Sequence, residues 1–302
     1  MDTLQPITVS PTRLLNKGYA IALIGVAFWS STAIFISYLL SHYTLAPLTL
    51  AFWRDLFVST SLGLALLFAR RDLLRVDRRH LPFLIGYGLS LAIFNTLWTY
   101  SVVLNGAAAS TVLAYSSPAF TAIIARKLFG ESLRRGRIAA IAVSIFGCGL
   151  VSGAFEPAAW SVNTAGILVG LGSGLLFAVY SIMGKFAARR QINSWSATWV
   201  SFGVAAALLL LTQTGSTLFT LEGAIDGWII LIVLAVVPSL AGYGLYAVSL
   251  GYLPASTANL IAALEPALTA ILAFVVLGES LSAIQLVGSA LILGSVVSLR
   301  GR

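Results

Sequence analysis

The sequence predicts an all-α integral membrane protein with ten transmembrane helices in two inverted five-helix repeats. Three observations predict this class: the composition, the spacing of the apolar runs and an internal repeat. Of the 302 residues, 59% are hydrophobic and 9% are charged, whereas soluble domains carry about 25% charged residues. So few charges cannot cover a soluble surface. The composition therefore disfavours soluble, disordered and nucleic-acid-binding proteins.

The apolar runs are long enough to cross a bilayer, which takes about 20 mainly apolar residues per helix. No formal charge lies between Lys17 and Arg54, a stretch too long for one helix. Ser41-His42-Tyr43 interrupts it, and Pro47 is suited to opening a second helix. The same reasoning along the chain gives ten spans: Gly18–Ser41, Pro47–Ala69, Leu81–Val103, Ala107–Phe129, Gly136–Ala154, Thr164–Lys185, Ser194–Gln213, Gly227–Leu250, Ala255–Leu277 and Ser282–Leu299.

The cations gather on one side of the predicted membrane. Seventeen of the 18 Lys and Arg residues lie in segment 1–17, in the loops at 70–79, 126–137 and 185–190, or at the C-terminus. Positively charged loops stay in the cytoplasm. We therefore expect a cytoplasmic N-terminal segment 1–17, a first helix that stays as an anchor, and both termini in the cytoplasm. The alternative for the Arg clusters, a nucleic-acid patch, is not needed because topology already explains their placement.

Two halves of the chain repeat each other, at 18–154 and 164–299. Four short matches carry the repeat: Tyr100–Leu104 with Tyr246–Leu250, Ala109–Thr111 with Ala255–Thr257, Pro118–Ile123 with Pro266–Ile271, and Gly130–Leu133 with Gly278–Leu281. Each unit holds five helices, so the second copy has to enter the membrane in the opposite orientation. Inverted repeats are typical of secondary transporters, which bind their substrates near the midplane between the halves.

These features resemble the EamA-type transporters of the drug/metabolite transporter superfamily. The resemblance rests on Pro118 with Gly130-Glu131, on Glu265-Pro266 with Gly278-Glu279, on Trp29-Ser30-Ser31 and on Phe52-Trp53-Arg54. It implies ten helices around a central cavity, with the fifth and tenth helices peripheral, in a bacterial inner membrane. It also implies export from the cytoplasm, and it includes the YddG-like exporters of aromatic amino acids.

Two prolines and one acid are candidates for movement and coupling. Pro118 and Pro266 lie about ten residues into equivalent helices, where each is expected to kink its helix. We interpret them as a pair of hinges, with a static kink as the alternative. Glu265 lies about 15 Å into its span, and a carboxylate at that depth marks function by default. It either binds a coupling proton or hydrogen-bonds the backbone that Pro266 frees.

Arg54 is the cation inside a span. It lies seven residues into its helix and is expected near the outer face, where its side chain can reach the interface. Pairing with Asp55 looks awkward, since adjacent helical residues do not face each other. The two interpretations are a structural ion pair and attraction of a substrate carboxylate.

Aromatic and amide side chains at helical spacing are candidates for substrate binding. Large flat surfaces with a few hydrogen-bonding groups suit small organic ligands. For each residue, interhelical hydrogen bonding or an interfacial aromatic belt is the alternative. The candidates are Trp29, Asn95, Trp98, Tyr115, Tyr180, Tyr243, Tyr246 and Asn259.

The sequence lacks zinc-site and phosphate-loop motifs, so we expect no cofactor, no metal, no catalytic residue and no enzymatic activity. The prediction is a secondary transporter that exports amino acids, aromatic ones included, or similar amphipathic metabolites by alternating access. A passive facilitator or channel is the alternative. The expected partners are the small-molecule substrate and the lipid bilayer, with a proton as the candidate coupling ion and with no nucleic acid. The expected state is a monomer or weak dimer.

Overall fold

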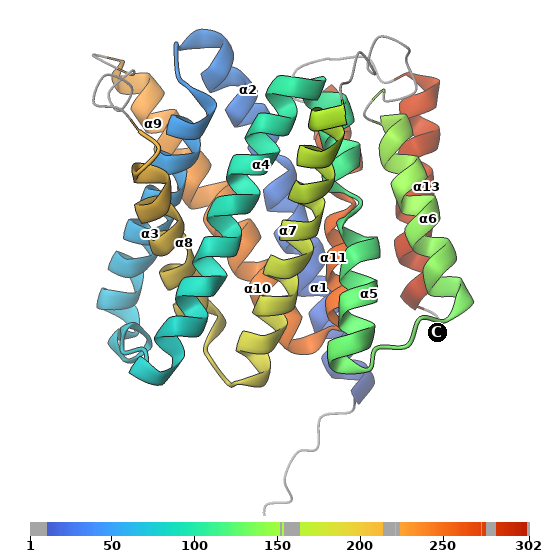
Figure 1. Ribbon diagram of the computed structural model, residues 1–302, viewed down its shortest axis with the longest axis horizontal. Helices are drawn as coiled ribbons and strands as arrows, with labels where there is room; N and C mark the ends of the chain where they lie inside the picture. The colour runs from blue at the N-terminus through green and yellow to red at the C-terminus, as the bar shows by residue number, and fades with distance from the viewer. Residues whose placement is uncertain are drawn as a thin grey trace, which may run out of the picture.

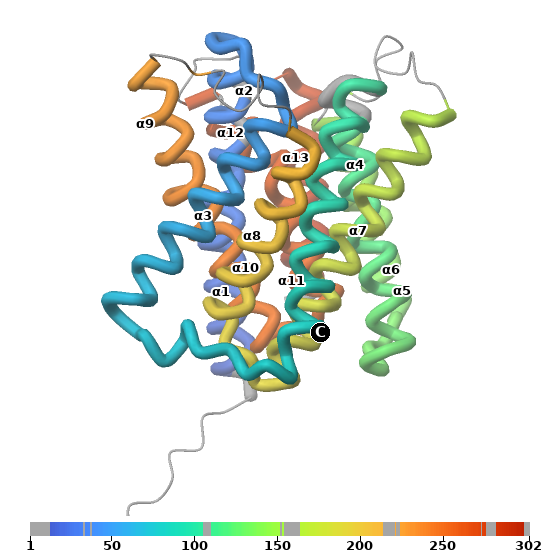
Figure 2. Tube along the Cα trace, turned by 60° about the vertical axis from the view of Figure 1, so that its left-hand side comes forward, coloured from blue at the N-terminus to red at the C-terminus, as the bar shows by residue number. Residues whose placement is uncertain are grey.

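The computed structural model describes residues 11–151, 153, 164–213, 221, 224–272, 274, 275 and 282–300, and within them every regular element is helical. The longer helices stand side by side as one upright bundle (Figures 1 and 2). In chain order the helices are α1 (Pro11–Ser30), α2 (Thr32–His42), α3 (Pro47–Ala69), η1 (Arg71–Leu74), η2 (Arg78–His80), α4 (Leu81–Ala114), α5 (Ser117–Phe129), α6 (Arg135–Val151), α7 (Thr164–Arg189), α8 (Ser194–Leu210), α9 (Ile225–Leu234), the π-helix η4 (Ala235–Leu240), α10 (Ala241–Tyr252), α11 (Ala255–Ala262), α12 (Glu265–Leu272) and α13 (Ala283–Arg300).

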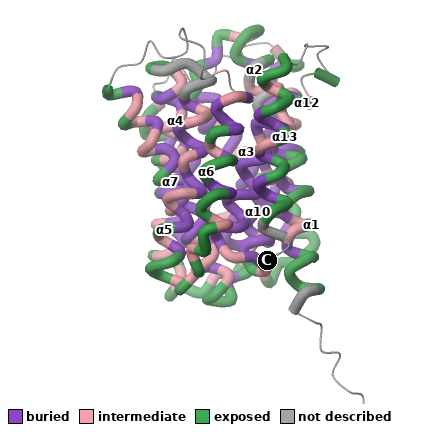
Figure 3. The backbone as a smooth tube through the Cα atoms, turned by 90° about the vertical axis from the view of Figure 1, so that its right-hand side faces the viewer, coloured by how far each residue is buried: buried purple, intermediate pink, exposed green. Residues whose placement is uncertain are grey.

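The outside of the bundle is apolar. Leu168, Val297 and Phe68 are 65%, 68% and 81% exposed, and exposed backbone surrounds a buried interior in Figure 3. Six helical stretches in the described residues are long and apolar enough to cross a membrane. Soluble proteins rarely expose large contiguous apolar patches, so this surface is suited to contact with lipid.

Several predicted spans are interrupted rather than continuous. The first divides at Ser31 into α1 and α2, and the span predicted over Ala255–Leu277 divides at Ala263 and Leu264 into α11 and α12. A π-helical turn containing Pro238 separates α9 from α10. Pro removes a helical hydrogen bond, and π-helices occur as single-turn bulges inside α-helices. The interruption at Pro238 was not predicted, although the proline is a signal for it.

The predicted connection between the third and fourth spans, at Val103 to Ala107, lies inside the segment assigned to α4, which runs from Leu81 to Ala114. Within that segment Ser101 Oγ donates to Ser110 Oγ at 2.9 Å. Nine residues of straight helix span about 13 Å, so the chain reverses direction between the two serines. The part of α4 that follows this reversal ends at Ala114, and a turn at Tyr115 and Ser116 separates it from α5. The predicted fourth helix is therefore two pieces.

Cation-rich segments meet at one end of the bundle, which we call the cationic end. Lys17 lies over the ring of Tyr252, Arg189 over Phe129 and Arg190 over Phe83. Ser196 Oγ donates to the carbonyl of Leu73 at 2.7 Å, which brings the 70–79 loop to the same end. The N-terminus of α1 and the start of α4 also lie at this end (Figure 1).

The opposite end is held by uncharged contacts and one acid. Tyr43 Oη donates to Asp226 Oδ2 at 2.5 Å, and Thr49 Oγ1 donates to Gln213 Oε1 at 2.7 Å. The hydrogen bond to Asp226 raises the pKa of Tyr43 to about 12, so this phenol remains a donor at neutral pH. Both contacts join the first half of the chain to the second.

α6 and α13 form a pair at the side of the bundle (Figure 1). A Cβ on Gly147 would lie 2.8 Å from the carbonyl oxygen of Gly288, and one on Gly288 would lie 2.7 Å from that of Gly147. Glycine at both positions lets the backbones touch, as is usual for helices packed in lipid. The peripheral fifth and tenth helices that the family resemblance implies correspond to this pair.

Candidate functional site

Aromatic rings from five helices pack together in the interior. Trp29 on α1 lies 4.4 Å from Tyr243 and 5.8 Å from Tyr246, both on α10, between ring centroids. On α7, Phe177 lies 5.6 Å from Trp29, and Tyr180 lies 6.0 Å from Tyr243. We call Trp29, Tyr87, Phe177, Tyr180, Phe202, Tyr243 and Tyr246 the aromatic cluster; Tyr87 on α4 and Phe202 on α8 complete it, at 4.6 Å from Tyr180 and 5.1 Å from Tyr243.

Local helix geometry explains why these rings share one face. Phe177 and Tyr180 are three residues apart, as are Tyr243 and Tyr246, and residues three apart lie on the same face of a helix. Four predicted residues, Trp29, Tyr180, Tyr243 and Tyr246, are thus brought together. Phe177 and Phe202 were missed because they carry no polar group, although the spacing of Phe177 from Tyr180 could have indicated the first, and Tyr87 was not predicted either.

Asn259 joins four helices beside the aromatic cluster. Its Nδ2 donates to Ser181 Oγ at 2.8 Å, and its Oδ1 accepts from Ser117 Oγ at 2.9 Å. Ser181 and Tyr246 share a further hydrogen bond of 2.6 Å. Asn259 is fully buried on α11. Its amide therefore ties α5 and α7 to the first piece of the broken α11–α12 span, and through Ser181 the link extends to Tyr246 on α10.

Tyr115 and Glu265 meet where two helices are broken. Tyr115 Oη donates to Glu265 Oε2. Tyr115 lies in the turn between α4 and α5, and Glu265 begins α12 directly after the turn at Ala263 and Leu264. A carboxylate in the first turn of a helix receives favourable interactions from its free N–H groups. Matched breaks thus bring one acid and one phenol together.

The sequence predicted that the two prolines kink continuous helices. In the structure they do not. Pro118 and Pro266 are each the second residue of a helix, α5 and α12. At that position no intrahelical hydrogen bond is lost and the fixed φ favours the first turn. They therefore open new half-helices after a break, at equivalent places in the two repeats.

Arg54 does not extend to the interface, and its pairing with Asp55 is not awkward. Both residues are buried, at 7% and 0% exposure. Arg54 Nε and Nη2 both donate to Asp55 Oδ1 at 3.1 Å, and Asn95 Nδ2 donates to Asp55 Oδ2 at 2.8 Å. The long Arg side chain turns back along the helix to reach its neighbour. Asp55, which the sequence argument mentioned only as a poor partner, is the centre of this site.

Three charged groups lie near one ring of the aromatic cluster, that of Tyr243. Arg54, Asp55 and Glu265 all lie close enough for their charges to act on the phenol of Tyr243. Trp98 is the exception among the predicted residues, since it is half-buried on α4 and makes no ring contact within the described part of the chain. The interior thus combines flat apolar surfaces with one cation and two acids.

Nothing in this interior resembles a metal centre: the described residues contain no group of three or more His, Cys, Asp or Glu side chains placed to hold an ion. Cys148, the one cysteine of the sequence, is buried on α6 with its Sγ 3.7 Å from the carbonyl oxygen of Ala263. It packs against the break between α11 and α12.

Apolar spanning helices, breaks at equivalent positions and buried charges beside an aromatic cluster define a multi-pass membrane transporter rather than an enzyme. The model of the EamA-like transporter family matches the chain twice, over residues 16–153 and 164–300. The chain belongs to this family.

Proteins of similar sequence are also named as transporters or efflux pumps. An uncharacterized transporter of Archaeoglobus fulgidus is 28% identical over 232 residues, covering 76% of this chain and 79% of that protein. A probable amino-acid metabolite efflux pump of Salmonella typhimurium is 27% identical over 294 residues, covering 93% and 94%. A solved crystal structure shares the fold, with a TM-score of 0.79, 18% identity and coverage of 94% and 96%.

Proposed function

We propose that this transporter exports amino acids, aromatic ones included, or similar small amphipathic metabolites from the cytoplasm across the bacterial inner membrane. It works by alternating access of two inverted five-helix halves, with both termini in the cytoplasm. The observation that carries the proposal is the pair of broken helices, α4–α5 and α11–α12, that bring Tyr115 and Glu265 together beside the aromatic cluster. Broken helices at matching positions point to the transport site in such folds.

The direction of two helices supports the inverted arrangement. Ser117, at the start of α5, bonds Asn259 in the middle of α11, whereas Glu131, just after the end of α5, bonds Ala255 at the start of α11. The two helices therefore run antiparallel. In the repeat, Pro118 on α5 matches Pro266 on α12, the second piece of the span that begins with α11. This match indicates that equivalent spans of the two halves point in opposite directions.

The charges around the aromatic cluster support an amino acid as the substrate. Arg54 uses two of its five N–H donors on Asp55, and within the described residues no other acceptor is bonded to it. A substrate carboxylate can take the remaining donors, in the bidentate geometry that guanidinium favours. Glu265 supplies the complementary acid for an ammonium group, and the rings of Trp29 and Phe177 offer a flat apolar surface.

Glu265 is also our candidate for proton coupling. It is half-buried, and its bonded partner is the neutral phenol of Tyr115. With no cation bonded to it in the described structure, its carboxylate is free to exchange a proton as its surroundings change. Export in exchange for protons would then alternate substrate ammonium and proton at this carboxylate.

The described conformation keeps the cluster away from water. Tyr180 and Tyr246 are 0% exposed, and Trp29 is 6% exposed. Because the rings pack against one another, a substrate reaches them only after the helices separate. This requirement favours a carrier over a pore that stays open through the bilayer.

Transport by purified protein in liposomes tests the proposal. Labelled aromatic and aliphatic amino acids are supplied with and without a pH gradient, and with unlabelled substrate loaded on the opposite side. A carrier accelerates uptake of label under this counterflow, whereas a passive facilitator does not. Absence of transport for every amino acid tested would reject the substrate class, and uptake without acceleration would reject alternating access.

A further inference from the structure

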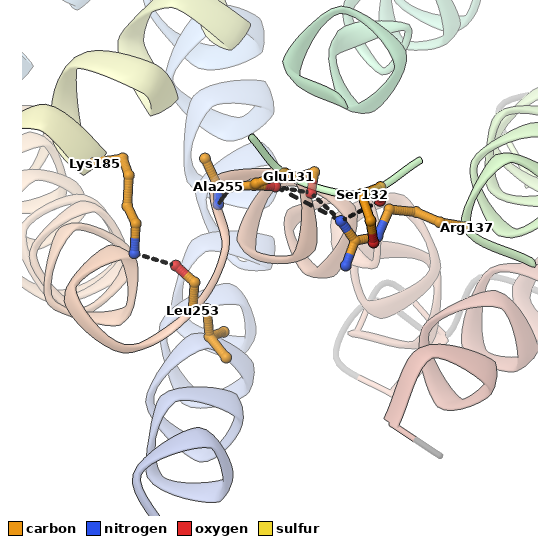
Figure 4. A network of polar contacts seen from close by, with 7 residues as sticks. Glu131, Ser132, Arg137, Lys185, Leu253 and Ala255 are labelled. Carbon is orange, nitrogen blue, oxygen red and sulfur yellow. Dashed lines mark hydrogen bonds and ion pairs between the residues drawn. The ribbon is translucent and has the colours of Figure 1, made fainter. Parts of the chain in front are cut away.

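The repeated motif Gly-Glu-Ser-Leu has no part in the function proposed above, and its first copy makes a dense set of contacts at the cationic end. Glu131 accepts hydrogen bonds from the backbone N–H groups of Ala255 at 2.8 Å and Ser256 at 3.4 Å, and from the Ser256 hydroxyl. Figure 4 shows this group beside the start of α11. The second copy, Gly278–Leu281, lies outside the described residues.

Local backbone geometry aims Glu131 at its partners. Gly130 has φ +69°, in the left-handed region, and ends α5. A Cβ there would meet nothing within 4 Å, so the backbone conformation rather than crowding favours glycine. The turn directs the next residue away from its own helix and toward the second half of the molecule.

The carboxylate meets positive groups from both halves. The free N–H groups at the start of α11 attract an anion, and Arg137 Nη1 lies 3.7 Å from Glu131 Oε2. Arg137 also donates to the Ser132 carbonyl at 3.0 Å and to Ser256 Oγ at 3.2 Å. The side chains of Glu131 and Arg137 are 10% and 20% exposed, so water screens these contacts less than it screens a surface ion pair.

The start of α11 is itself fixed in place. Lys185 Nζ donates to the carbonyls of Leu250 at 2.8 Å and Leu253 at 2.7 Å, at the end of α10. These bonds hold the α10–α11 connection to α7, next to the residues that Glu131 contacts (Figure 4). Lys185, Leu253 and Ala255 all belong to the second half, whereas Glu131 and Arg137 belong to the first.

We infer that Glu131, Arg137 and the first two residues of α11 form a latch that closes the cationic end of the transporter and must open in every transport cycle. The inference rests on the alternating access proposed above. Opening this end moves α5 away from α11, which breaks several charge-assisted bonds at once. The latch therefore sets how often that end opens.

Cysteine accessibility tests the latch without any substrate. Thr257 is 3% exposed and directly follows Ser256 on α11. In a Cys148→Ala background, Thr257→Cys is labelled with an impermeant maleimide, in vesicles whose cationic end faces the medium. We expect Glu131→Gln to speed labelling about tenfold, the equivalent of losing one charge-assisted hydrogen bond from the closed state. An unchanged rate overturns the latch.

Two controls separate opening from general loosening. Asp77→Asn removes an exposed ion pair at the same end, with Arg79 at 2.7 Å, that joins residues of one loop, and it should leave the rate unchanged. In the Cys148→Ala background, Ile292→Cys lies in the peripheral α6–α13 pair, where the native Ile292 is 0% exposed beside Gly147, and its labelling should not change in Glu131→Gln. Equal acceleration at position 292 would mean general loosening and would overturn the inference.

A locked protein distinguishes failure of the latch from failure of the proposed function. Glu131→Cys with Ser256→Cys is joined by a short bifunctional thiol reagent, again without Cys148. We expect the joined protein to lose transport and to regain it when the linker is cleaved. Transport at the unlinked rate overturns the latch while the transporter assignment stands. If no amino acid is carried, faster labelling in Glu131→Gln still supports the latch and rejects only the substrate class.

Discussion

At the scale of single residues, the buried charges are costly. Arg54 and Asp55 are buried within the apolar helix α3, and an ionised side chain inside a spanning helix costs a few kcal/mol on insertion scales. An ion pair there gains little over apolar residues of similar volume. This cost supports our proposal that the pair binds substrate, and the hydrogen bond from Asn95 fixes the orientation of Asp55.

Substitution of this pair separates stability from function. Asp55→Asn leaves Arg54 as a buried unpaired cation, and we expect about 3–5 kcal/mol of destabilisation, measured as a lower melting temperature in detergent. Arg54→Leu with Asp55→Leu should regain most of that stability and still not transport amino acids. If the double variant transports normally, Arg54 has no part in binding.

Glu265 gives the second residue-scale prediction. Glu265→Gln keeps an oxygen to accept from Tyr115 but cannot exchange a proton. We expect the variant to fold and to lose the dependence of transport on a pH gradient in liposomes. Tyr115→Phe serves as the matched control, since it removes the same hydrogen bond and leaves the carboxyl group. A pH dependence that survives in Glu265→Gln assigns coupling to another group.

At the scale of helices, breaks rather than kinks shape the interior. The turn at Tyr115 and Ser116 and the turn at Ala263 and Leu264 leave backbone groups that a continuous helix would have bonded. A further break separates α1 from α2. There, Thr269 Oγ1 on α12 donates to the carbonyl of Ser30 at 2.8 Å. A contact of this kind couples the position of α12 to the break between α1 and α2.

Proline at the start of each half-helix is expected to keep the breaks in place. Pro118→Ala or Pro266→Ala removes no backbone hydrogen bond of the folded state, and alanine is a good helix former that allows the two pieces to join. We expect the yield of folded protein to be unchanged and transport per folded molecule to fall several-fold. Equal transport rates would show that the breaks are held by other residues.

Close packing of α6 on α13 allows a stability prediction with an internal control. Gly147→Ala places a methyl group 2.8 Å from the carbonyl oxygen of Gly288, and we expect a loss of about 1–3 kcal/mol from overpacking. Gly294→Ala, on α13, meets nothing within 4 Å and should be neutral or slightly stabilising. Thermal unfolding of the two variants makes the comparison, and similar melting temperatures would contradict the packing argument.

At the scale of the whole molecule, contacts between the two halves close both ends. The latch joins the halves at the cationic end, and Tyr43 with Asp226 joins them at the other. The aromatic cluster lies buried between these ends. Alternating access requires the two sets of contacts to break in turn, so their relative strength decides which side opens more often.

The inverted orientation is open to a direct test. Epitope tags placed just before Ala109 and just before Ala255 should be accessible from opposite compartments, because equivalent points of inverted repeats face opposite sides. Tags in the 70–79 loop mark the cytoplasmic side as a reference. Accessibility of both tags from one compartment would exclude the inverted arrangement and, with it, the proposed mechanism.

Much of this protein could be predicted from its sequence, because patterns along one dimension report the solvent around a helix. The scarcity of charge, the apolar runs and the matched prolines identified a transporter of this family, and the cations predicted which segments share one end. Hydropathy and charge along the chain identify the segments that lie in lipid and the side on which their loops lie. These features could therefore be predicted without a structure.

Tertiary structure alone decided how the interior is connected. The contact of Asn95 with Asp55, the packing of Phe177 in the aromatic cluster and the contact of Glu131 with α11 all depend on side chains brought together from distant segments. Hydropathy does not encode which helices become neighbours. That choice follows from packing and hydrogen bonding between helices, which exist only once the chain is folded.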